Sequence, residues 1–544
     1  MAPGRSLFTY SPSDPASVTT RGCIKANAPL ASRTNDINNP KMNDQSEERK
    51  EKPRIRQLTM EGRAVASAVL GIALLAYVGS KIWGTTRGSL PSTYRERMLR
   101  HADAEKDLVE HPIQIHKPEV RKVTENIYMA IGYALANSIM LIGPDGIVIV
   151  DVTESYESGR EVFAAFRNIT KKPVKAIVYT HNHADHTYGA RAFIEDPNNP
   201  PEIWAHIGIL KEFKRTFSSI TQAFMVRAMR QFGALLPDEI TSGRGIGQKL
   251  QYGTSKNSIG VVYPNKYVQQ QVTEFNAAGL NMSIVHIPGE TDDQIGVWFP
   301  DDKAFLCADD IYRAFPNLYA IRGTPNRDLM QWARSIDVML SFRPQYLVPS
   351  HTNPVIGEDN IRDILVPYRD AIQFVHDQTV RYINQGLSPE EIAEIIKLPK
   401  SLQGHPYLKE FYGTVGWSAK SVFNAYLGWF NGDAVSLNPL TAKARAERMV
   451  KLVGASKLVQ TAKEAYASND YQWALELSSQ VLLVDNSNSE AREIKIDSLI
   501  SLGSRQISRN GRNYYMTSAF EEAGTYYVKF WRRKEKEGNR NTTN

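Results

Sequence analysis

The sequence of 544 residues is poor in cysteine: Cys23 and Cys307 are its two thiols. Two thiols cannot form the disulfide framework of a small secreted protein, and they exclude a structural zinc site built from cysteines. Basic residues exceed acidic ones only slightly, 65 against 58, and no arginine-rich tract or nucleic-acid-binding motif concentrates this excess. We therefore expect no nucleic-acid partner. Hydrophobic residues make up 42% of the chain, which excludes wholesale disorder.

Long apolar runs are also scarce. Residues 64–80 form an uncharged run, and about 17 residues is the lower limit for crossing a bilayer. We predict a transmembrane helix over 63–84 and hence a single-pass membrane protein, with a buried helix as the alternative. The tail up to Arg33 is basic and contains one acid, Asp14, so a mitochondrial membrane is an alternative location.

Composition and periodicity divide the chain into six segments. Strand-like and helical patterns alternate in the middle of the chain, which predicts an α/β fold, and the later pattern is helical. Within the helical part, residues 458–502 resemble a tetratricopeptide-type hairpin and its neighbour. The expected segments are a disordered tail (1–62), the transmembrane helix (63–84), a helical linker (85–111), an α/β domain (112–360), a helical domain (361–533) and a polar tail (534–544).

The most informative motif directly follows a strand expected over Val174–Tyr179. The next side chains include His181, His183, Asp185 and His186, so four residues of metal-ligand type lie within six positions. At the end of a strand, the first two histidines can point to the same side, while the last two residues turn with the loop. Such a set suits two divalent metals better than one. The alternative is a solvated histidine-rich turn.

This His-x-His-x-Asp-His string resembles the metallo-β-lactamase superfamily. Glu290, Asp309 and His351 follow later apolar strands, in the order that this resemblance implies for further ligands. The resemblance implies an αββα sandwich over 112–360, with a dinuclear metal site at the strand ends.

Glu290 occupies a slot in which the superfamily usually carries a histidine, and a carboxylate there resembles the zinc-dependent alkyl sulfatases. Asp309 departs conservatively from that family, which usually has a glutamate at this place. Three further segments resemble the family: Asn317–Gly323, Tyr426–Asp433 and Arg512–Ala519. The resemblance covers roughly residues 112 to 530, and it implies that the helical region is a dimerisation domain and that the protein is a homodimer.

The resemblance also implies a complete site with two zinc ions per chain. One ion would be held by His181, His183 and Glu290, and the other by Asp185, His186 and His351, with Asp309 and a hydroxide between them. The metal-bound hydroxide would be the only catalytic group beyond the ligands. Arg322 and Asn317 would bind sulfate oxygens, for which the planar guanidinium is well suited. An internal salt bridge is the alternative role for Arg322.

Two features depart from the family. The segment Tyr412–Val415 is usually followed by Ser-His, and the histidine is expected to face the sulfate. Here Gly416 and Trp417 follow, so we expect Trp417 at a substrate-binding position and altered substrate recognition. A sterol-carrier-like domain that the family often carries at its C-terminal end is expected to be absent.

Together these observations predict a membrane-anchored dinuclear zinc hydrolase that cleaves an amphipathic alkyl sulfate ester to an alcohol and inorganic sulfate. One alternative is the hydrolysis of another ester, such as a lactone, thioester, β-lactam or phosphodiester, against which Glu290 and the large helical region argue. A second alternative is a non-catalytic membrane scaffold. Residues of ligand type at every expected ligand position argue against a scaffold.

Overall fold

The computed structural model describes Tyr94 and residues 96–97, 117–237, 240, 245–250 and 258–524. All of them belong to one compact unit of the chain, residues 61–544. The predicted tail (1–62), transmembrane helix (63–84) and polar C-terminal tail (534–544) lie outside the described residues, as does most of the predicted linker (85–111).

Two β-sheets form the centre of the fold. The first contains seven strands in the order β1-β2-β3-β4-β5-β6-β7, and the second contains six strands in the order β13-β12-β11-β10-β9-β8. The strands of the first sheet are β1 (Glu119–Lys122), β2 (Ile127–Ile131), β3 (Ser138–Ile142), β4 (Ile147–Val150), β5 (Val174–Val178), β6 (Glu202–His206) and β7 (Lys266–Val268). Those of the second are β8 (Val272–Ala277), β9 (Leu280–His286), β10 (Ile295–Phe299), β11 (Ala304–Ala308), β12 (Tyr346–Pro349) and β13 (Val355–Ile356).

In each sheet, one pair of parallel strands brings the residues that follow it to the same edge. Strand β4 pairs in parallel with β5, and β11 pairs in parallel with β12. These four strands consist mainly of buried apolar residues, as expected for strands that are covered on both faces. Because parallel strands end at the same edge of a sheet, the residues after β4 and β5 lie together, as do those after β11 and β12.

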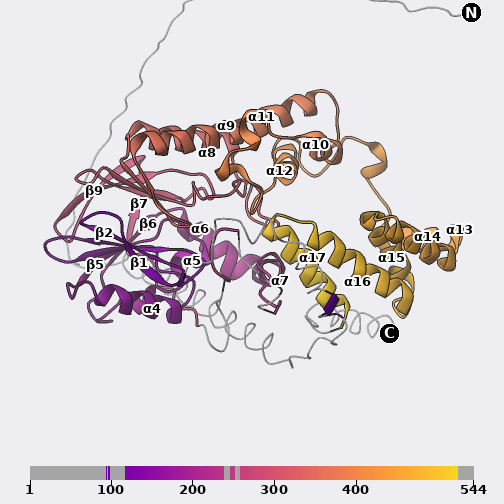
Figure 1. Ribbon diagram of the computed structural model, residues 1–544, viewed down its shortest axis with the longest axis horizontal. Helices are drawn as coiled ribbons and strands as arrows, with labels where there is room; N and C mark the ends of the chain where they lie inside the picture. The colour runs from indigo at the N-terminus through magenta and orange to yellow at the C-terminus, as the bar shows by residue number, and fades with distance from the viewer. Residues whose placement is uncertain are drawn as a thin grey trace, which may run out of the picture. The chain divides into compact units, whose positions relative to one another are not determined.

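The core lies in three apolar layers. Between the sheets, residues such as Val148 and Val178 from the first sheet pack with Ile284 and Leu306 from the second. Helix α4 (Tyr156–Arg167) covers the outer face of the first sheet, and α8 (Leu329–Ser341) and α9 (Glu358–Asn384) cover the outer face of the second (Figure 1). The predicted αββα sandwich is therefore confirmed.

Several helices begin at the capping residues that the sequence provides. The Ser155 side chain accepts a hydrogen bond from the backbone of Ser158 at the start of α4, and Asp328 does the same for α8. Ser388 and Glu391 form a reciprocal capping box at the start of α10 (Pro389–Ile395). Such caps satisfy amide groups that the first helical turn leaves without partners.

The chain after the sandwich is helical, as predicted. Its first helices join the core of the second sheet, whereas α14, α15 and α16 share a separate apolar core. Consecutive helices from α14 to α17 contact each other, in agreement with the predicted helical hairpin and its neighbour. The remaining helices are α5 (Ala184–Thr187), α6 (Ile209–Lys214), α7 (Thr221–Gln231), α11 (Lys400–Gln403), α12 (Val415–Leu427), α13 (Ala442–Val453), α14 (Ala455–Ala467), α15 (Tyr471–Val484), α16 (Ser489–Ser504) and α17 (Arg509–Glu522).

The predicted membrane location is contradicted. Of the helices in the described ranges, not one combines the length and the apolar composition needed to cross a bilayer. The longest of them, α9, has 27 residues, but acidic and basic side chains recur along it, and charged groups are costly in the bilayer centre. The predictions of a membrane anchor, a single-pass membrane protein and a mitochondrial membrane are therefore withdrawn; the residues on which they rested, 63–84, are outside the described part of the chain.

Candidate metal centre

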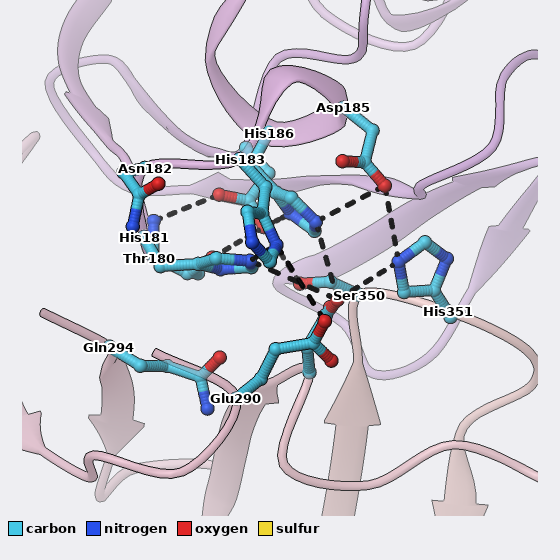
Figure 2. Close-up of polar contacts among 12 residues, drawn as sticks. Thr180, His181, Asn182, His183, Asp185, His186, Glu290, Gln294, Ser350 and His351 are labelled. Carbon is cyan, nitrogen blue, oxygen red and sulfur yellow. Dashed lines mark hydrogen bonds and ion pairs between the residues drawn. The ribbon is translucent and has the colours of Figure 1, made fainter. Parts of the chain in front are cut away.

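The predicted ligands come together at the edge where the two parallel strand pairs end. His181 follows β5, His183 caps the short helix α5, and Asp185 and His186 lie within this helix. From the second sheet, Asp309 follows β11 and His351 follows β12, while Glu290 lies in the loop between β9 and β10. Most of these side chains are fully buried, and His183 is the most exposed histidine among them. Figure 2 shows the side chains of the four histidines, Asp185 and Glu290 pointing toward one another.

The ligand atoms form two groups. The first contains His181, His183 and Asp309, and the second contains Asp185, His186 and His351; within each group, one ligand atom per residue lies within 4.8 Å of the others. Asp309 also belongs geometrically to the second group, because its Oδ2 atom is 3.1 Å from Nε2 of His351 and 3.5 Å from Nε2 of His186. A single carboxylate therefore lies between two sets of ligands.

Glu290 approaches the first group from the side. Its Oε1 atom is 3.7 Å from Nδ1 of His183, and that nitrogen is 2.8 Å from Nε2 of His181. We call His181, His183 and Glu290 the His183 group, and Asp185, His186 and His351 the His351 group. Asp309 lies between the two groups.

The outer nitrogens of three histidines have partners that orient the rings. Nδ1 of His186 is 2.7 Å from Oδ2 of Asp151, and Nδ1 of His351 is 2.9 Å from the carbonyl of Leu135. Nδ1 of His181 contacts the Thr180 hydroxyl at 3.0 Å. These contacts leave the Nε2 atoms facing the centre, which is the usual way in which a protein orients metal-binding histidines.

Asp151 is a functional residue that the sequence analysis missed. It directly follows β4 and has a left-handed backbone with φ of 59°, a conformation that aspartate tolerates better than most residues. Its carboxylate also accepts hydrogen bonds from the hydroxyls of Thr180 and Ser350, so it joins the ends of three strands. The signal available in the sequence was an acidic residue at the end of an apolar run.

The two groups differ in protonation. Burial lowers the pKa of His186 and His351, but the carboxylates of Asp309 and Asp185 outweigh this effect, so the pKa of His186 lies well above its usual value and that of His351 rises to about 10. In the other group, burial and neighbouring cationic groups hold the pKa of His181 and of His183 well below the usual value.

The site fits divalent cations on the chemistry of its donors. Within the described ranges, several buried donor atoms make no hydrogen bond, including Nε2 of His186, Nε2 of His351, Oδ1 of Asp309 and Oε2 of Glu290. Buried polar atoms normally have a partner, so a convergent set without one indicates space for a ligand. Imidazole and carboxylate donors in this combination are typical of zinc and related metals.

Arg327 is a second residue that the sequence analysis missed. Its side chain is almost completely buried; Nη2 lies 2.9 Å from Oε1 of Glu290, and Nη1 donates to the backbone carbonyl of Asn317. Burial raises the pKa of Glu290, and Arg327 opposes this effect. This arginine comes from the segment before α8, so its proximity to Glu290 depends on the tertiary fold.

Of the two predicted sulfate-binding residues, Arg322 lies beside a ligand. Nη2 of Arg322 is 3.0 Å from Nε2 of His183, and its guanidinium lies over the rings of Phe224 and Phe232, 5.8 and 5.4 Å from their centroids. Its Nη1 atom is buried and has no hydrogen-bond partner in the part of the chain that the structure describes. The same holds for both carboxamide atoms of Asn317.

Trp417 does not join this cluster. It lies in the first turn of α12, and its indole packs against the start of α17: a Cβ atom added to Gly511 would lie 3.0 Å from the ring. The cavities beside the metal ligands are lined by other residues.

Two cavities meet at His183. One, of about 480 Å³, is lined by the charged residues Arg322 and Asp185 and by the largely apolar side chains of Tyr188, Phe224, Phe232 and Leu250. The other, of about 330 Å³, is lined mainly by polar and charged residues, among them Glu290 and Arg327.

Comparison with known proteins agrees with this geometry. Residues 132–351 match the metallo-beta-lactamase superfamily, and residues 388–524 match the alkyl sulfatase dimerisation family. A linear primary-alkylsulfatase from a Pseudomonas species is 37% identical over 393 residues, which cover 71% of this chain and 74% of the relative. The alkyl/aryl-sulfatase BDS1 of Saccharomyces cerevisiae is 29% identical over 411 residues, which cover 74% of this chain but 63% of the yeast protein.

A solved structure shows the same fold. The stereoselective inverting sec-alkylsulfatase Pisa1 from Pseudomonas sp. superposes with a TM-score of 0.73 over 84% of this chain and 78% of its own, at 23% sequence identity. At this level of identity the likeness concerns the fold alone.

Proposed function

The chain belongs to the alkyl sulfatase family of the metallo-β-lactamase superfamily, and we propose that it hydrolyses amphipathic alkyl sulfate esters to an alcohol and inorganic sulfate at the metal centre. The family consists of sulfuric ester hydrolases, so the enzyme interpretation is favoured over a scaffold. The substrate and the number and identity of the metals are parts of the proposal.

The larger cavity carries this proposal, because its lining combines a buried guanidinium with apolar side chains, and such an ester has an anionic group and a hydrocarbon chain. Arg322 presents a buried guanidinium beside His183, and an anionic sulfate group would satisfy its Nη1 atom. The wall of Tyr188, Phe224, Phe232 and Leu250 would cover a hydrocarbon chain. Burial of a methylene group contributes about 0.8 kcal/mol, so several of them would stabilise the complex substantially.

The hydrogen-bond chemistry of His183 also favours an anion at Arg322. A histidine that ligates through Nδ1 carries its hydrogen on Nε2, and this nitrogen then cannot accept a hydrogen bond. Nη2 of Arg322 points at Nε2 of His183 and would then need another acceptor. A sulfate oxygen is such an acceptor, and the buried carboxamide of Asn317, which has no hydrogen-bond partner among the described residues, offers a second donor group.

Two zinc ions would complete the centre. The His183 group would hold one and the His351 group the other, with Asp309 between them. When bound, such metals supply Lewis-acid activation of water and stabilise developing negative charge. The contribution of the chain itself is orientation: Asp151 and the Leu135 carbonyl fix the rings of His186 and His351, while Arg322 holds the anionic end of the ester.

We also propose that the helical region forms a homodimer. The match to a dimerisation family supports this assembly. Between α12 and the end of α13, large apolar side chains are exposed, with Trp429, Val435 and Leu452 more than two thirds accessible. Exposed apolar patches of this kind mark interaction surfaces, and a second copy of this chain would cover them.

The domain boundaries are part of the proposal. A catalytic domain over 112–360 and a dimerisation domain over 361–533 agree with the change from strands to helices. However, α9 begins at Glu358, and the helices from α9 to α12 share the core of the second sheet. We therefore expect the two domains to unfold together rather than independently.

The decisive experiment is sulfate release by the full chain, with metal analysis of the same preparation. We expect about two zinc ions per chain, hydrolysis of medium- and long-chain alkyl sulfates, and a particle mass twice the 61.2 kDa of one chain by light scattering. Lactones, thioesters, β-lactams and phosphodiesters assayed in parallel should react much more slowly. Bound zinc without sulfate release at any chain length would contradict the substrate assignment but leave the metal centre intact.

A further inference from the structure

Glu290 poses a structural problem that a histidine in the same slot would not. A histidine ligand is a rigid ring oriented by one contact at its other nitrogen, whereas a glutamate has three rotatable bonds and two equivalent oxygens. Glu290 is 3% exposed and lies near the acidic Asp309, so its carboxylate is both desolvated and close to like charge. A ligand of this kind needs a partner that holds it in place.

Arg327 occupies the position of such a partner. It donates from Nη2 to Oε1 of Glu290 at 2.9 Å, and both side chains are only 2 to 3% exposed. The contact engages one carboxylate oxygen and leaves Oε2 without a hydrogen bond among the described residues. Metal-binding carboxylates are commonly held in this way by a hydrogen bond from outside the metal's own ligands.

The same guanidinium reaches the anion-binding segment. Nη1 of Arg327 donates to the carbonyl of Asn317, and the Asn317 amide donates to the Tyr312 hydroxyl at 2.7 Å. At the other end of this segment, the backbone of Arg322 is held by Gln231 and Arg227 from α7. Arg327 therefore contacts a predicted metal ligand and the backbone of a predicted sulfate-binding residue at once.

We infer that Arg327 is a positioning residue that holds the Glu290 carboxylate in one orientation for a metal and joins this ligand, through Asn317, to the segment that carries Arg322. This inference rests on the proposed metal centre. It assigns a function to a buried arginine whose hydrogen bonds go to Glu290 and to the carbonyl of Asn317.

The positive charge of Arg327 and its positioning role are expected to change the metal affinity in opposite directions. A fixed positive charge near a cation site weakens cation binding, so its removal by itself would strengthen binding. Loss of positioning has the opposite effect, since loss of such outer partners typically weakens metal affinity about 10- to 100-fold. Loss of the charge also removes the interaction that opposes the raised pKa of Glu290, so Arg327→Met alone does not separate the two effects. A weaker site in Arg327→Lys, which keeps the positive charge, is therefore attributed to lost orientation.

The experiment is a zinc titration of the chelator-treated full chain against a competing chromophoric chelator, which resolves two classes of site. We expect Arg327→Met and Arg327→Lys to lower the zinc affinity of the His183 group, which contains Glu290, about 10- to 100-fold. The zinc affinity of the His351 group should be unchanged. The lysine variant retains the charge but lacks the two-pronged contact. The matched control is Arg215→Met, which removes a positive charge from the wall of the same cavity, where Arg215 pairs with Glu212; it should weaken neither class.

A double-mutant cycle separates positioning from a general structural role. In the Glu290→His background, Arg327→Met should cost no zinc affinity, because the imidazole does not depend on the arginine. An equal loss in both backgrounds, or unchanged or tighter zinc binding in Arg327→Met and Arg327→Lys, would overturn the inference. Absence of zinc binding by the unmodified chain would instead contradict the proposed metal centre.

Discussion

In the His351 group, carboxylates raise the pKa of two histidines, whereas in the His183 group burial and neighbouring cations lower it. The neighbours explain the contrast. Asp151 and Asp309 surround His186, while Arg322 and Arg327 approach the His183 group from the side of the cavities. Similar ligand types on neighbouring strand ends are therefore placed in electrostatic environments of opposite sign.

This difference indicates that the two ligand groups have different roles. The two histidines of the His351 group are fully buried and have raised pKa values, so binding of a cation there must displace protons. The histidines of the His183 group have lowered pKa values, and Arg322 beside them lines the cavity in which an anionic substrate would lie. The acidic environment suits retention of a metal, and the basic one suits recognition of a sulfate group.

The largest expected effect comes from removing a ligand of the cavity-facing group. His183→Ala should reduce sulfate release by more than about 100-fold, the upper end of the loss expected for an outer partner of a ligand. The same variant should retain zinc in the His351 group, because Asp185, His186 and His351 are unchanged. Sulfate assays and metal analysis on one preparation test both points, and loss of both metals together would show that the groups are not independent.

A smaller and more selective effect is expected from Asp151. Asp151→Asn replaces a carboxylate that accepts three side-chain hydrogen bonds, at 2.7 to 3.0 Å, with an amide that cannot accept all of them. Zinc affinity of the His351 group should fall about 10- to 100-fold, while that of the His183 group stays the same. The control is Asp302→Asn, whose carboxylate accepts from Thr124 and Asn126 outside the site. Equal weakening of both groups in a zinc titration would remove the proposed difference.

The two groups should also differ in the pH dependence of zinc binding. In the metal-free protein, the pKa of His351 is raised to about 10, so its contribution to stability is fully present below about pH 6.5 and is lost as the pH rises towards 10. Zinc must displace this proton, so affinity at the His351 group should rise about tenfold per pH unit for each proton released between pH 6.5 and 9. The His183 group should show a weaker slope over this range, because the pKa of both its histidines is lowered.

Zinc titrations at several pH values, together with melting temperatures of the metal-free chain, measure both slopes. Identical slopes for the two classes of site would contradict the comparison. A rise in metal-free stability between pH 6.5 and 9 would have the wrong sign for a histidine with a raised pKa.

Much of the centre could be predicted because it is local in sequence. Apolar strands such as β5, β11 and β12 are recognisable from their composition, and residues of ligand type follow each of them. Parallel strands bring such residues to one edge, whereas the division of the ligands between two metals came from the resemblance to the alkyl sulfatases. The predicted sandwich and the helical region after it were confirmed for the same reason.

Two further features depend on distant contacts. The indole of Trp417, a predicted substrate-binding residue, packs against Gly511 in a helix almost one hundred residues later. Asp151 was not singled out from the sequence, and its contacts with His186 and Ser350 join three separate strand ends. The membrane location depended on composition alone, and the described helices contradict it.

By itself, the sequence determined the ligand types, their order and the strands that carry them, because these depend on short-range periodicity and residue chemistry. Only the tertiary structure decided which charges surround each ligand. The Glu290–Arg327 pair spans two loops, and the neighbours of His186 come from both sheets. Since electrostatic interactions depend on distance and burial rather than on position along the chain, the opposite character of the two ligand groups emerges only when the sheets pack together.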